Sequence, residues 1–248
     1  MTKKADPETA LVALPVAEGG FVALADDYAR ELLADVKPGP RDLAKLLVPA
    51  GSGGAFFSIV KLDGEEAVKS LDIIVAYDGP TERSFYATSI DESEGGPPHC
   101  TSPSGVTGYG NRDVEAIRAA GAATDQLEQS EQACADCAFA KYGTALNGGK
   151  GQACSQRKRL VVFDRESILP MVLQIPAASL KAFKQYQMLL VNERLRSSHV
   201  VTAVSLAKQK GSPDYYTVEF KFIRKLEPGE VQALAATAKI LTAAAAQD

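Results

Sequence analysis

Residues 133–154 read ACADCAFAKYGTALNGGKGQAC, and this stretch decides how we expect the chain to be organised. It contains three of the four cysteines, while the fourth lies upstream. A C-x-x-C pair presents two thiolates from one turn, and a structural zinc ion takes four such ligands at about 2.3 Å in a tetrahedral arrangement. Glycines after the pair allow the backbone to bring distant sulfurs together. The sequence therefore predicts a closed, structural zinc site with the ligands Cys100, Cys134, Cys137 and Cys154.

Other interpretations of these cysteines are open on the sequence alone. A C-x-x-C is also typical of thioredoxin-like redox pairs, which lie at a strand-to-helix junction of a βαβ unit. Here the pair follows a Gln- and Glu-rich segment and precedes a Gly-rich one, which disfavours that reading. Structural disulfides are rare in cytosolic chains. His99 is a candidate to replace one cysteine as a zinc ligand. A zinc deaminase is excluded because neither H-x-E nor P-C-x-x-C is present.

The composition indicates a folded protein that lies outside membranes. The chain has 248 residues, 46% of them hydrophobic, which is enough to bury a sizeable core. No apolar, uncharged window approaches the length of about 18 residues that a membrane helix needs. The start MTKKADPETA lacks the apolar core of a signal peptide, so we expect a cytoplasmic protein. Two histidines and no tryptophan leave little basis for an enzyme that needs an imidazole base, and we expect a non-enzymatic protein.

Charge is distributed unevenly along the chain. The formal net charge is −4, which by itself argues against a nucleic-acid partner. Residues 140–226, however, contain fifteen lysines and arginines against five aspartates and glutamates. Such asymmetry is typical of a chain with a surface for a polyanion, although a solvated lysine-rich sheet would give the same count.

The first half of the chain is expected to begin with helices and to continue with strands. Residues 1–50 are predicted to form an N-terminal tail and helices, with an amphipathic helix over residues 21–36 and a short one over residues 41–47. Apolar runs then predict strands over residues 55–60, 71–77 and 84–88. The sequence Asp78-Gly79-Pro80 predicts a turn between the last two.

The second half is expected to alternate strands and helices. The pattern predicts strands over residues 160–163 and 171–175, followed by a helix from an N-cap at Ser179 to about residue 196. A hairpin with strands over residues 200–206 and 215–223 follows, with Phe220 and Phe222 in the core. An alanine-rich helix is expected over residues 228–245.

These elements predict a mainly β protein with flanking helices, of the α+β class. The strand, helix, strand, strand order over residues 171–223 is typical of the second half of an OB-fold. We therefore expect a small OB-like barrel interrupted by a zinc-binding insertion. The predicted units are an N-terminal tail with helices (residues 1–50), the OB-like barrel (51–97 and 157–226), the zinc-binding insertion (98–156) and a C-terminal helix (227–248).

Several runs carry a resemblance: H-C-T-S-P-S-G, C-A-D-C, G-G-K-G-Q-A-C-S-Q-R-K-R-L-V-V-F, I-P-A-A-S-L-K-A-F-K-Q-Y and V-V-T-A-V-S-L. Over residues 71–226 the chain resembles a family of phage-encoded single-stranded-DNA-binding proteins. In architecture it also resembles the helix-destabilising proteins of T-even phages, which carry a zinc-binding subdomain on an OB-fold. The resemblance implies zinc on the four cysteines and a place in the cytoplasm of the infected host. It does not extend to an acidic C-terminal tail, because the last residues are alanines before Gln247 and Asp248.

Binders of single strands combine a basic groove for phosphates with aromatic faces on which bases stack. The candidate phosphate contacts are Lys141, Lys150, Arg157, Lys158, Arg159, Lys208, Lys210, Lys221, Arg224 and Lys225. The candidate stacking residues are Tyr142, Tyr215 and Tyr216, with Phe139 as a further choice. The cluster at residues 157–159 follows the cysteines directly, so we expect the metal to fix where it points.

The sequence thus predicts a protein that binds single-stranded DNA without strong sequence preference, and coats and protects it during phage DNA replication or recombination. Replication or recombination proteins are its expected further partners. One alternative is a single-strand annealing protein or recombination mediator with the same surface, and another is an adaptor that binds proteins through the zinc module. The Gly-rich run is not a phosphate-binding loop of the Walker type, because Lys150 is followed by Gly151 rather than by Ser or Thr.

Overall fold

A computed structural model describes residues 20–21, 31, 34–36, 42–49, 54–61, 64–88, 96–121, 123–146, 148–211 and 214–245. The described strands are β1 (Ala44–Leu47), β2 (Phe57–Lys61), β3 (Gly64–Val68), β4 (Ser70–Phe85), β5 (Cys100–Ser102), β6 (Thr107–Gly110), β7 (Ser130–Ala133), β8 (Cys154–Phe163), β9 (Met171–Pro176), β10 (Val200–Gln209) and β11 (Tyr215–Lys225). The helices with bounds are α3 (Val114–Ala120), α4 (Ala177–Asn192) and α5 (Pro228–Ala245), with 3-10 turns η1 (Thr124–Gln126), η2 (Ala138–Ala140) and η3 (Ser197–His199).

The strands form one large sheet, in the order β3-β2-β1-β9-β8-β4-β5-β6-β7, and the hairpin of β10 and β11 joins it through β4. The pair β1 and β9 is parallel, and the other pairs are antiparallel. The protein is therefore mainly β with flanking helices, as the sequence predicts. The pairings among the described strands leave the sheet open, so the closed, OB-like barrel expected from the sequence is not what they form.

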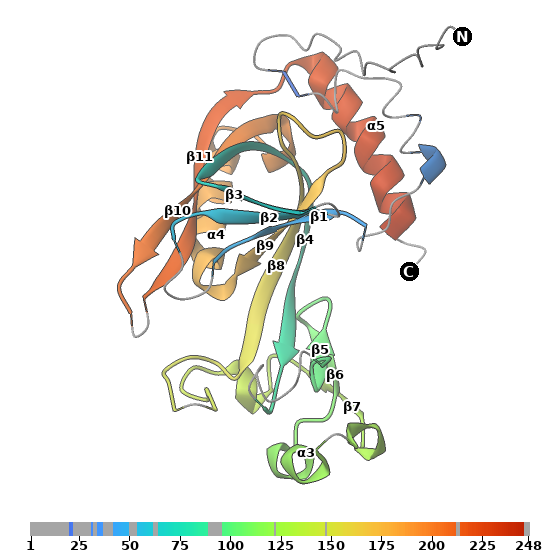
Figure 1. The fold of residues 1–248 in the computed structure, drawn as a ribbon, viewed down its shortest axis with the longest axis vertical. Coiled ribbons are helices and arrows are strands. Elements are labelled where there is room, and N and C mark those ends of the chain that lie inside the picture. The colour runs from blue at the N-terminus through green and yellow to red at the C-terminus, as the bar shows by residue number, and fades with distance from the viewer. Residues whose placement is uncertain are drawn as a thin grey trace, which may run out of the picture.

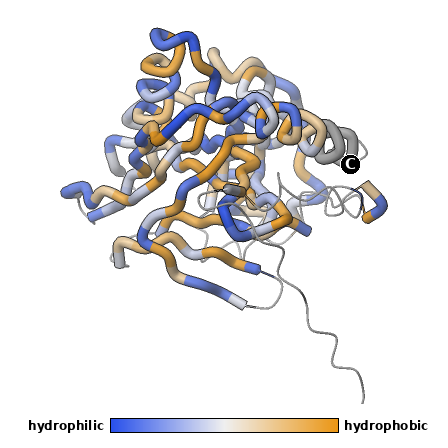
Figure 2. The backbone as a smooth tube through the Cα atoms, turned by 90° about the horizontal axis from the view of Figure 1, so that it is seen from above, coloured by the Kyte–Doolittle hydropathy of each residue, from blue (hydrophilic) through white to orange (hydrophobic). Residues whose placement is uncertain are grey.

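The open sheet nevertheless curls, so that strands distant in the pairing order share one core cluster. Ile59 lies on β2, near one end of the strand order, and Val218 lies on β11, in the hairpin that joins at β4, yet both belong to one buried cluster with Phe183 of α4. Ser179 was expected to cap α4, but it lies within the helix and is buried. Its Oγ accepts a hydrogen bond from the backbone N–H of Val218 at 2.9 Å, so it ties α4 to β11. Figure 2 shows the apolar stretches gathered on the central strands.

The opposite face of β4 is covered by α5. Ile73 and Val75 of β4 belong to the first core, whereas Ile74 packs with Phe163 and with Leu234 of α5 in a second one. This division follows the two-residue period of a strand, whose neighbouring side chains point to opposite faces. It explains why residues 71–77 are almost continuously apolar, and Figure 1 shows α5 lying across this part of the molecule.

Strands β4 and β8 are long, and they leave the core together as a two-stranded ribbon (Figure 1). We call residues 81–85 of β4 and 154–158 of β8 the stalk, and residues 99–153, which hold β5, β6, β7 and α3, the cysteine module. The turn predicted at residues 78–80 is wrong, because β4 runs through it with a shift of register between Asp78 and Thr81. Gly79 passes so close to β8 that a Cβ there would lie 2.9 Å from Arg159 O.

The N-terminal part differs from the sequence expectation where it is described. Residues 44–47, predicted as part of a short helix, form β1, which pairs with both β2 and β9. Tertiary pairing outweighs the helix preference of so short a segment, and it buries Leu46 completely. Most of the helix predicted over residues 21–36 lies outside the described residues, although 31 and 34–36 are helical.

The later elements agree with their prediction more closely. The hairpin of β10 and β11, strand β9 and helices α4 and α5 are confirmed, and β8 begins earlier than expected, at Cys154. Phe220 packs on the core, but Phe222 was wrongly placed there, because it is 40% exposed. Strands β3, β5, β6 and β7 were not predicted. Among the described helices, none combines the length and the apolar character needed to cross a membrane.

Candidate metal centre and the groove beside it

The four cysteines come from different elements that meet at the outer end of the stalk. Cys100 is the first residue of β5 and Cys154 the first of β8, and both are in register with Phe85 of β4. Cys134 and Cys137 flank the turn between β7 and η2. The Cys134 N–H donates to Val106 O at 2.7 Å, which fixes this turn beside the loop before β6.

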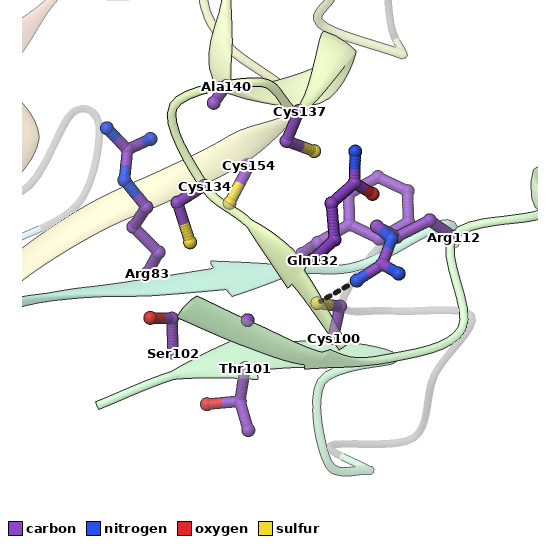
Figure 3. A pocket seen from close by; sticks show the side chains of 12 residues that line it. Arg83, Cys100, Thr101, Ser102, Arg112, Gln132, Cys134, Cys137, Ala140 and Cys154 are labelled. Carbon is purple, nitrogen blue, oxygen red and sulfur yellow. Dashed lines mark hydrogen bonds between the residues drawn. The ribbon is translucent and has the colours of Figure 1, made fainter. Parts of the chain in front are cut away.

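All four cysteines line one small cavity of about 20 Å³, and Figure 3 shows their sulfurs arranged around a common space. Each side chain is buried, and each is a free thiol. A cavity of this size has room for about one water-sized occupant. The structure thus brings together the whole predicted ligand set, although its members are far apart in the sequence.

Glycines allow strand β6 to approach the sulfurs. A Cβ at Gly108 would lie 3.2 Å from Cys100 Sγ and 3.5 Å from Cys134 Sγ, so any side chain here would press on the Cys100 sulfur and touch that of Cys134. Gly110 has φ of +145°, and a Cβ there would lie 2.2 Å from His99 O. The backbone positions around the cavity are therefore ones that only glycine fills without displacement.

Two arginines line the cavity of the four cysteines. Arg112 donates from Nη1 to Cys100 Sγ at 3.3 Å and from Nη2 to Ser130 Oγ at 2.7 Å. Burial raises the pKa of the Cys154 thiol, and the positive charge of the nearby Arg83 guanidinium opposes that rise. The neighbouring sulfurs of Cys137 and Cys100 raise the pKa of Cys154 further, because like charges at close range disfavour one another. A cation among these sulfurs would remove that repulsion.

The donors fit a four-coordinate metal ion in their chemistry. Zinc in structural sites is bound by four Cys or His ligands, and four buried thiols share this cavity. Among the described residues, no three or more His, Cys, Asp or Glu side chains yet stand in a geometry that could hold a metal. Coordination would therefore require the sulfurs to draw together. Zinc at this site remains our proposal.

The structure disfavours two alternative interpretations of the cysteines, namely His99 as a zinc ligand and a thioredoxin-like redox pair. His99 does not line the cavity, and its Nδ1 accepts a hydrogen bond from Ala87 N–H at 3.3 Å, while burial lowers its pKa. The C-x-x-C follows an antiparallel strand, β7, and leads into a 3-10 turn. It therefore does not lie at the strand-to-helix junction of a βαβ unit that a thioredoxin-like redox pair needs.

Four of the predicted phosphate contacts are engaged by acidic side chains. Lys158 lies 2.5 Å from Asp78 and Lys208 lies 3.0 Å from Asp214, and Arg224 donates to both carboxylate oxygens of Glu230. Arg159 forms an ion pair with Glu82. Tyr216, a predicted stacking residue, is buried. These residues were assigned from sequence without their partners, which only the pairing of the strands reveals.

The basic cluster at residues 157–159 is divided between two faces of β8. Lys158 faces α4, with its Nζ 5.8 Å from the centre of the Phe183 ring. Arg157 is exposed and alternates with Lys158 along the strand, so it points away from α4. The metal therefore cannot orient the three side chains as one unit.

The remaining predicted contacts are exposed, and their side chains have no hydrogen-bond or ion-pair partner among the described residues. These residues are Lys141, Tyr142, Lys150, Arg157, Lys210, Tyr215, Lys221 and Lys225. Tyr142 is the most exposed of the aromatic ones at 83%, and it lies with Lys141 in the loop that follows η2. Phe139, nearby, instead stacks on Phe85 with ring centres 4.5 Å apart.

An open groove of about 440 Å³ runs between α4 and the stalk. Its charged residues are Arg83, Lys158 and Lys184, and no aspartate or glutamate lines it. The neutral lining residues are Thr81, Ser104, Gly105, Gln156, Leu180, Phe183 and Gln187. Arg83 and Lys184 were not among the contacts predicted from the sequence. The signal that could have found them is the long antiparallel pairing of β4 with β8, which places Arg83 opposite Gln156 beneath α4.

The other large groove of the described structure has a different character. It has a volume of about 570 Å³, and the carboxylates of Glu66, Asp72, Asp164 and Glu166 line it together with Lys61 and Arg165. Arg165 donates to Asp72 there at 2.7 Å. Its mixed charge distinguishes it from the groove beside α4. Comparison with known protein families, with curated proteins and with solved structures finds no match to this chain.

Proposed function

We propose that this protein binds single-stranded DNA without strong sequence preference, and that the groove between α4 and the stalk holds the phosphate backbone. The observation that carries the proposal is the lining of this groove, which contains three cationic side chains and no carboxylate. A nucleic-acid backbone is recognised chiefly by such cations, because their binding releases the counterions condensed on the phosphates. Coating and protecting exposed strands in phage replication or recombination is the role that fits this surface, and no catalytic step is proposed.

The three cations of the groove differ in whether an acidic side chain compensates their charge. Asp78 pairs with Lys158 and also accepts a hydrogen bond from Gln187 at 2.5 Å, so one of the three cations is largely compensated. Lys184 is exposed and has no partner among the described residues. Arg83 presents a planar fork of N–H donors, which suits a phosphate with two accepting oxygens. We therefore assign the strongest phosphate contacts to Arg83 and Lys184.

Bases would stack on aromatic side chains outside the groove. Tyr142 is exposed in the cysteine module and stands beside Lys141, so a π-face and a cation lie next to each other. Every base has a π-face, which is why such a contact tolerates any sequence. If zinc binds to Cys100, Cys134, Cys137 and Cys154, it supplies cross-links that hold this module at the end of the stalk.

The test is binding of fluorescently labelled oligo-dT, followed by anisotropy at several salt concentrations, with oligo-rU and a DNA duplex as further probes. We expect dissociation constants in the micromolar range or tighter for the single strands, with affinity falling as salt rises. K184Q should weaken binding, because it removes a free cation from the groove. K225Q is the matched control, because Lys225 is another exposed candidate from the sequence but lies at the end of β11 next to α5, outside the groove.

Two results would overturn the proposal. One is the absence of binding at low salt, which would favour instead an adaptor that docks proteins. The other is an equal effect of K184Q and K225Q, which would mean that the groove beside α4 is not the binding site. Acceleration of the pairing of complementary strands, measured with a quenched fluorophore pair, would add strand annealing to the function of the same surface.

A further inference from the structure

Asp78 lies where β4 departs from regular pairing, at the inner end of the groove between α4 and the stalk. Asp78 is in register with Leu160 and Thr81 with Lys158, so β4 carries one residue more than β8 in this interval, which makes a β-bulge. The side chain of Leu160 belongs to the core cluster that contains Phe183 of α4. Because directly opposed residues point to the same face, Asp78 also points toward α4.

Both partners of the Asp78 carboxylate are residues that line the groove. Lys158 Nζ lies 2.5 Å from Asp78 Oδ1 as an ion pair, and Gln187 Nε2 donates to Asp78 Oδ2 at 2.5 Å. Lys158 also donates to the backbone carbonyl of Gly79 at 2.5 Å. Asp78 itself does not line the groove. The carboxylate therefore engages two of the groups that a phosphate in the groove would contact.

The pair of Lys158 and Asp78 is sheltered from solvent. The side chains are 15% and 27% exposed, so dissolved salt screens their attraction less than it would at an open surface. An ammonium group has three N–H donors, and Asp78 and Gly79 already engage Lys158. Lys184, by contrast, is exposed and has no partner among the described residues. Lys158 is thus a groove cation whose charge is balanced within the protein.

We propose that Asp78 is an internal competitor of the nucleic-acid phosphate, which limits how tightly the groove holds a single strand. The inference rests on the function proposed above and names the residue that regulates the same site. A carboxylate and a phosphate are both anionic acceptors for an ammonium group, so each weakens the hold of the other on Lys158. While Lys158 is paired with Asp78, it contributes little to the release of counterions, and the strand is held chiefly by Arg83 and Lys184.

The experiment measures the affinity for labelled oligo-dT by anisotropy at several salt concentrations, in the natural chain and in D78N. We expect D78N to bind about fivefold more tightly at low salt, because Lys158 becomes available to a phosphate. The plot of log affinity against log salt concentration should become steeper by about 0.7, which is the contribution of one further phosphate contact on a single strand. The double variant D78N/K158Q should return both quantities to those of the natural chain.

E82Q is the matched control. Glu82 lies on the same strand, its side chain is 24% exposed, and it pairs with Arg159, so E82Q changes the net charge by the same amount and also releases a cation. Glu82 alternates with Thr81 and Arg83, which line the groove, so it points to the opposite face of the ribbon. E82Q should therefore leave the affinity and its salt dependence nearly unchanged.

Thermal denaturation establishes whether each variant is folded, and D78S, which also removes the carboxylate, is used if D78N is not. An equal effect of D78N and E82Q would overturn the inference, because it would reduce the role of Asp78 to net charge. A natural chain that binds oligo-dT and a D78N variant that binds it no more tightly would overturn the inference alone. If neither protein binds oligo-dT at low salt, the proposed function fails, and the inference fails with it.

Discussion

Cys100 and Cys154 flank the same residue of the sheet, because each is in register with Phe85 of the strand between them. Directly opposed residues on neighbouring strands point to the same face, so both sulfurs reach the cavity from one side of the sheet. The C-x-x-C turn after β7 supplies the other two. The candidate metal centre therefore depends on strand pairing as well as on the C-x-x-C turn. The positions of the Cys100 and Cys154 sulfurs are set by their pairing with the end of β4.

We predict that the purified protein contains one zinc ion per chain and that C134S removes it. Because the metal would hold the cysteine module together, the melting temperature of C134S should fall by at least about 5 °C. The measurements are elemental analysis and thermal denaturation. S155A, which changes a residue beside Cys154 whose Oγ donates to Ser84 O, should keep its zinc. The metal centre would be contradicted if the purified protein contained no zinc and if a chelator did not change its melting temperature.

Gly108 should be required for metal binding. A methyl group at this position would lie 3.2 Å from Cys100 Sγ, which is closer than most side-chain contacts, and at an ordinary contact distance of 3.5 Å from Cys134 Sγ. We expect G108A to lower the zinc affinity about tenfold or more, measured by chelator competition, because the Cys100 sulfur is pushed off its position. G151A is the control, because a methyl group there would meet only Ala145 Cβ at 3.9 Å. Equal zinc affinities of the two variants would place the metal elsewhere.

Tyr142 should contribute to the binding of single strands but not to stability. Its side chain is 83% exposed, so Y142A should leave the melting temperature unchanged. Because stacking of one base is worth about 1–3 kcal/mol, we expect the affinity for oligo-dT to fall about tenfold, as measured by anisotropy. Y142F should restore it, since the ring remains. Tyr109, exposed on β6, serves as the aromatic control; an effect of Y109A as large as that of Y142A would argue against a specific stacking role.

The ion pair between Arg224 and Glu230 should make stability depend on pH in acid. The hydrogen bond from Arg224 lowers the pKa of Glu230, against a smaller opposing effect of burial, and the Glu227 N–H lowers it further. A lowered carboxyl pKa in the folded state stabilises the protein above the ordinary value of about 4.5. That contribution is lost as the pH falls through the folded-state pKa.

For E230Q we therefore expect a loss of about 1 kcal/mol at pH 7, measured by urea denaturation. The difference from the natural chain should shrink toward zero as the pH falls through the pKa of Glu230. Glu219, which is exposed on β11 and has no partner among the described residues, provides the control variant E219Q. A stability difference for E230Q that stays constant with pH would show that the lost contribution is not electrostatic.

The elements that the sequence predicted correctly are those whose pattern is local. The alternation of residues 215–223 follows from a strand with one buried face, and the spacing of Cys134 and Cys137 follows from a single turn. Residues 44–47 form β1 only because β2 and β9 are present on either side, so no local pattern could reveal that strand. The sequence Asp78-Gly79-Pro80 has the composition of a turn, but the long partner strand β8 keeps the chain extended.

The binding surface was the least predictable part. Lys158 was expected to contact phosphate, but its partner Asp78 is distant in the sequence, and only the register of β4 and β8 brings them together. The same register places Arg83 and Gln156 opposite each other, and α4 then adds Lys184. A charge count along the chain finds the basic half, but it cannot distinguish a compensated cation from a free one.

The stalk gives the molecule a modular construction. Thr81 and Lys158 face each other across β4 and β8 at the point where the ribbon leaves the core. A tight turn of about two residues is enough to join two antiparallel strands at such a place. Everything beyond that point, including all four cysteines, is thus attached to the core through a single pair of strands. During evolution, such a unit can be gained, lost or exchanged by one event at a hairpin, without any rearrangement of the framework that carries it.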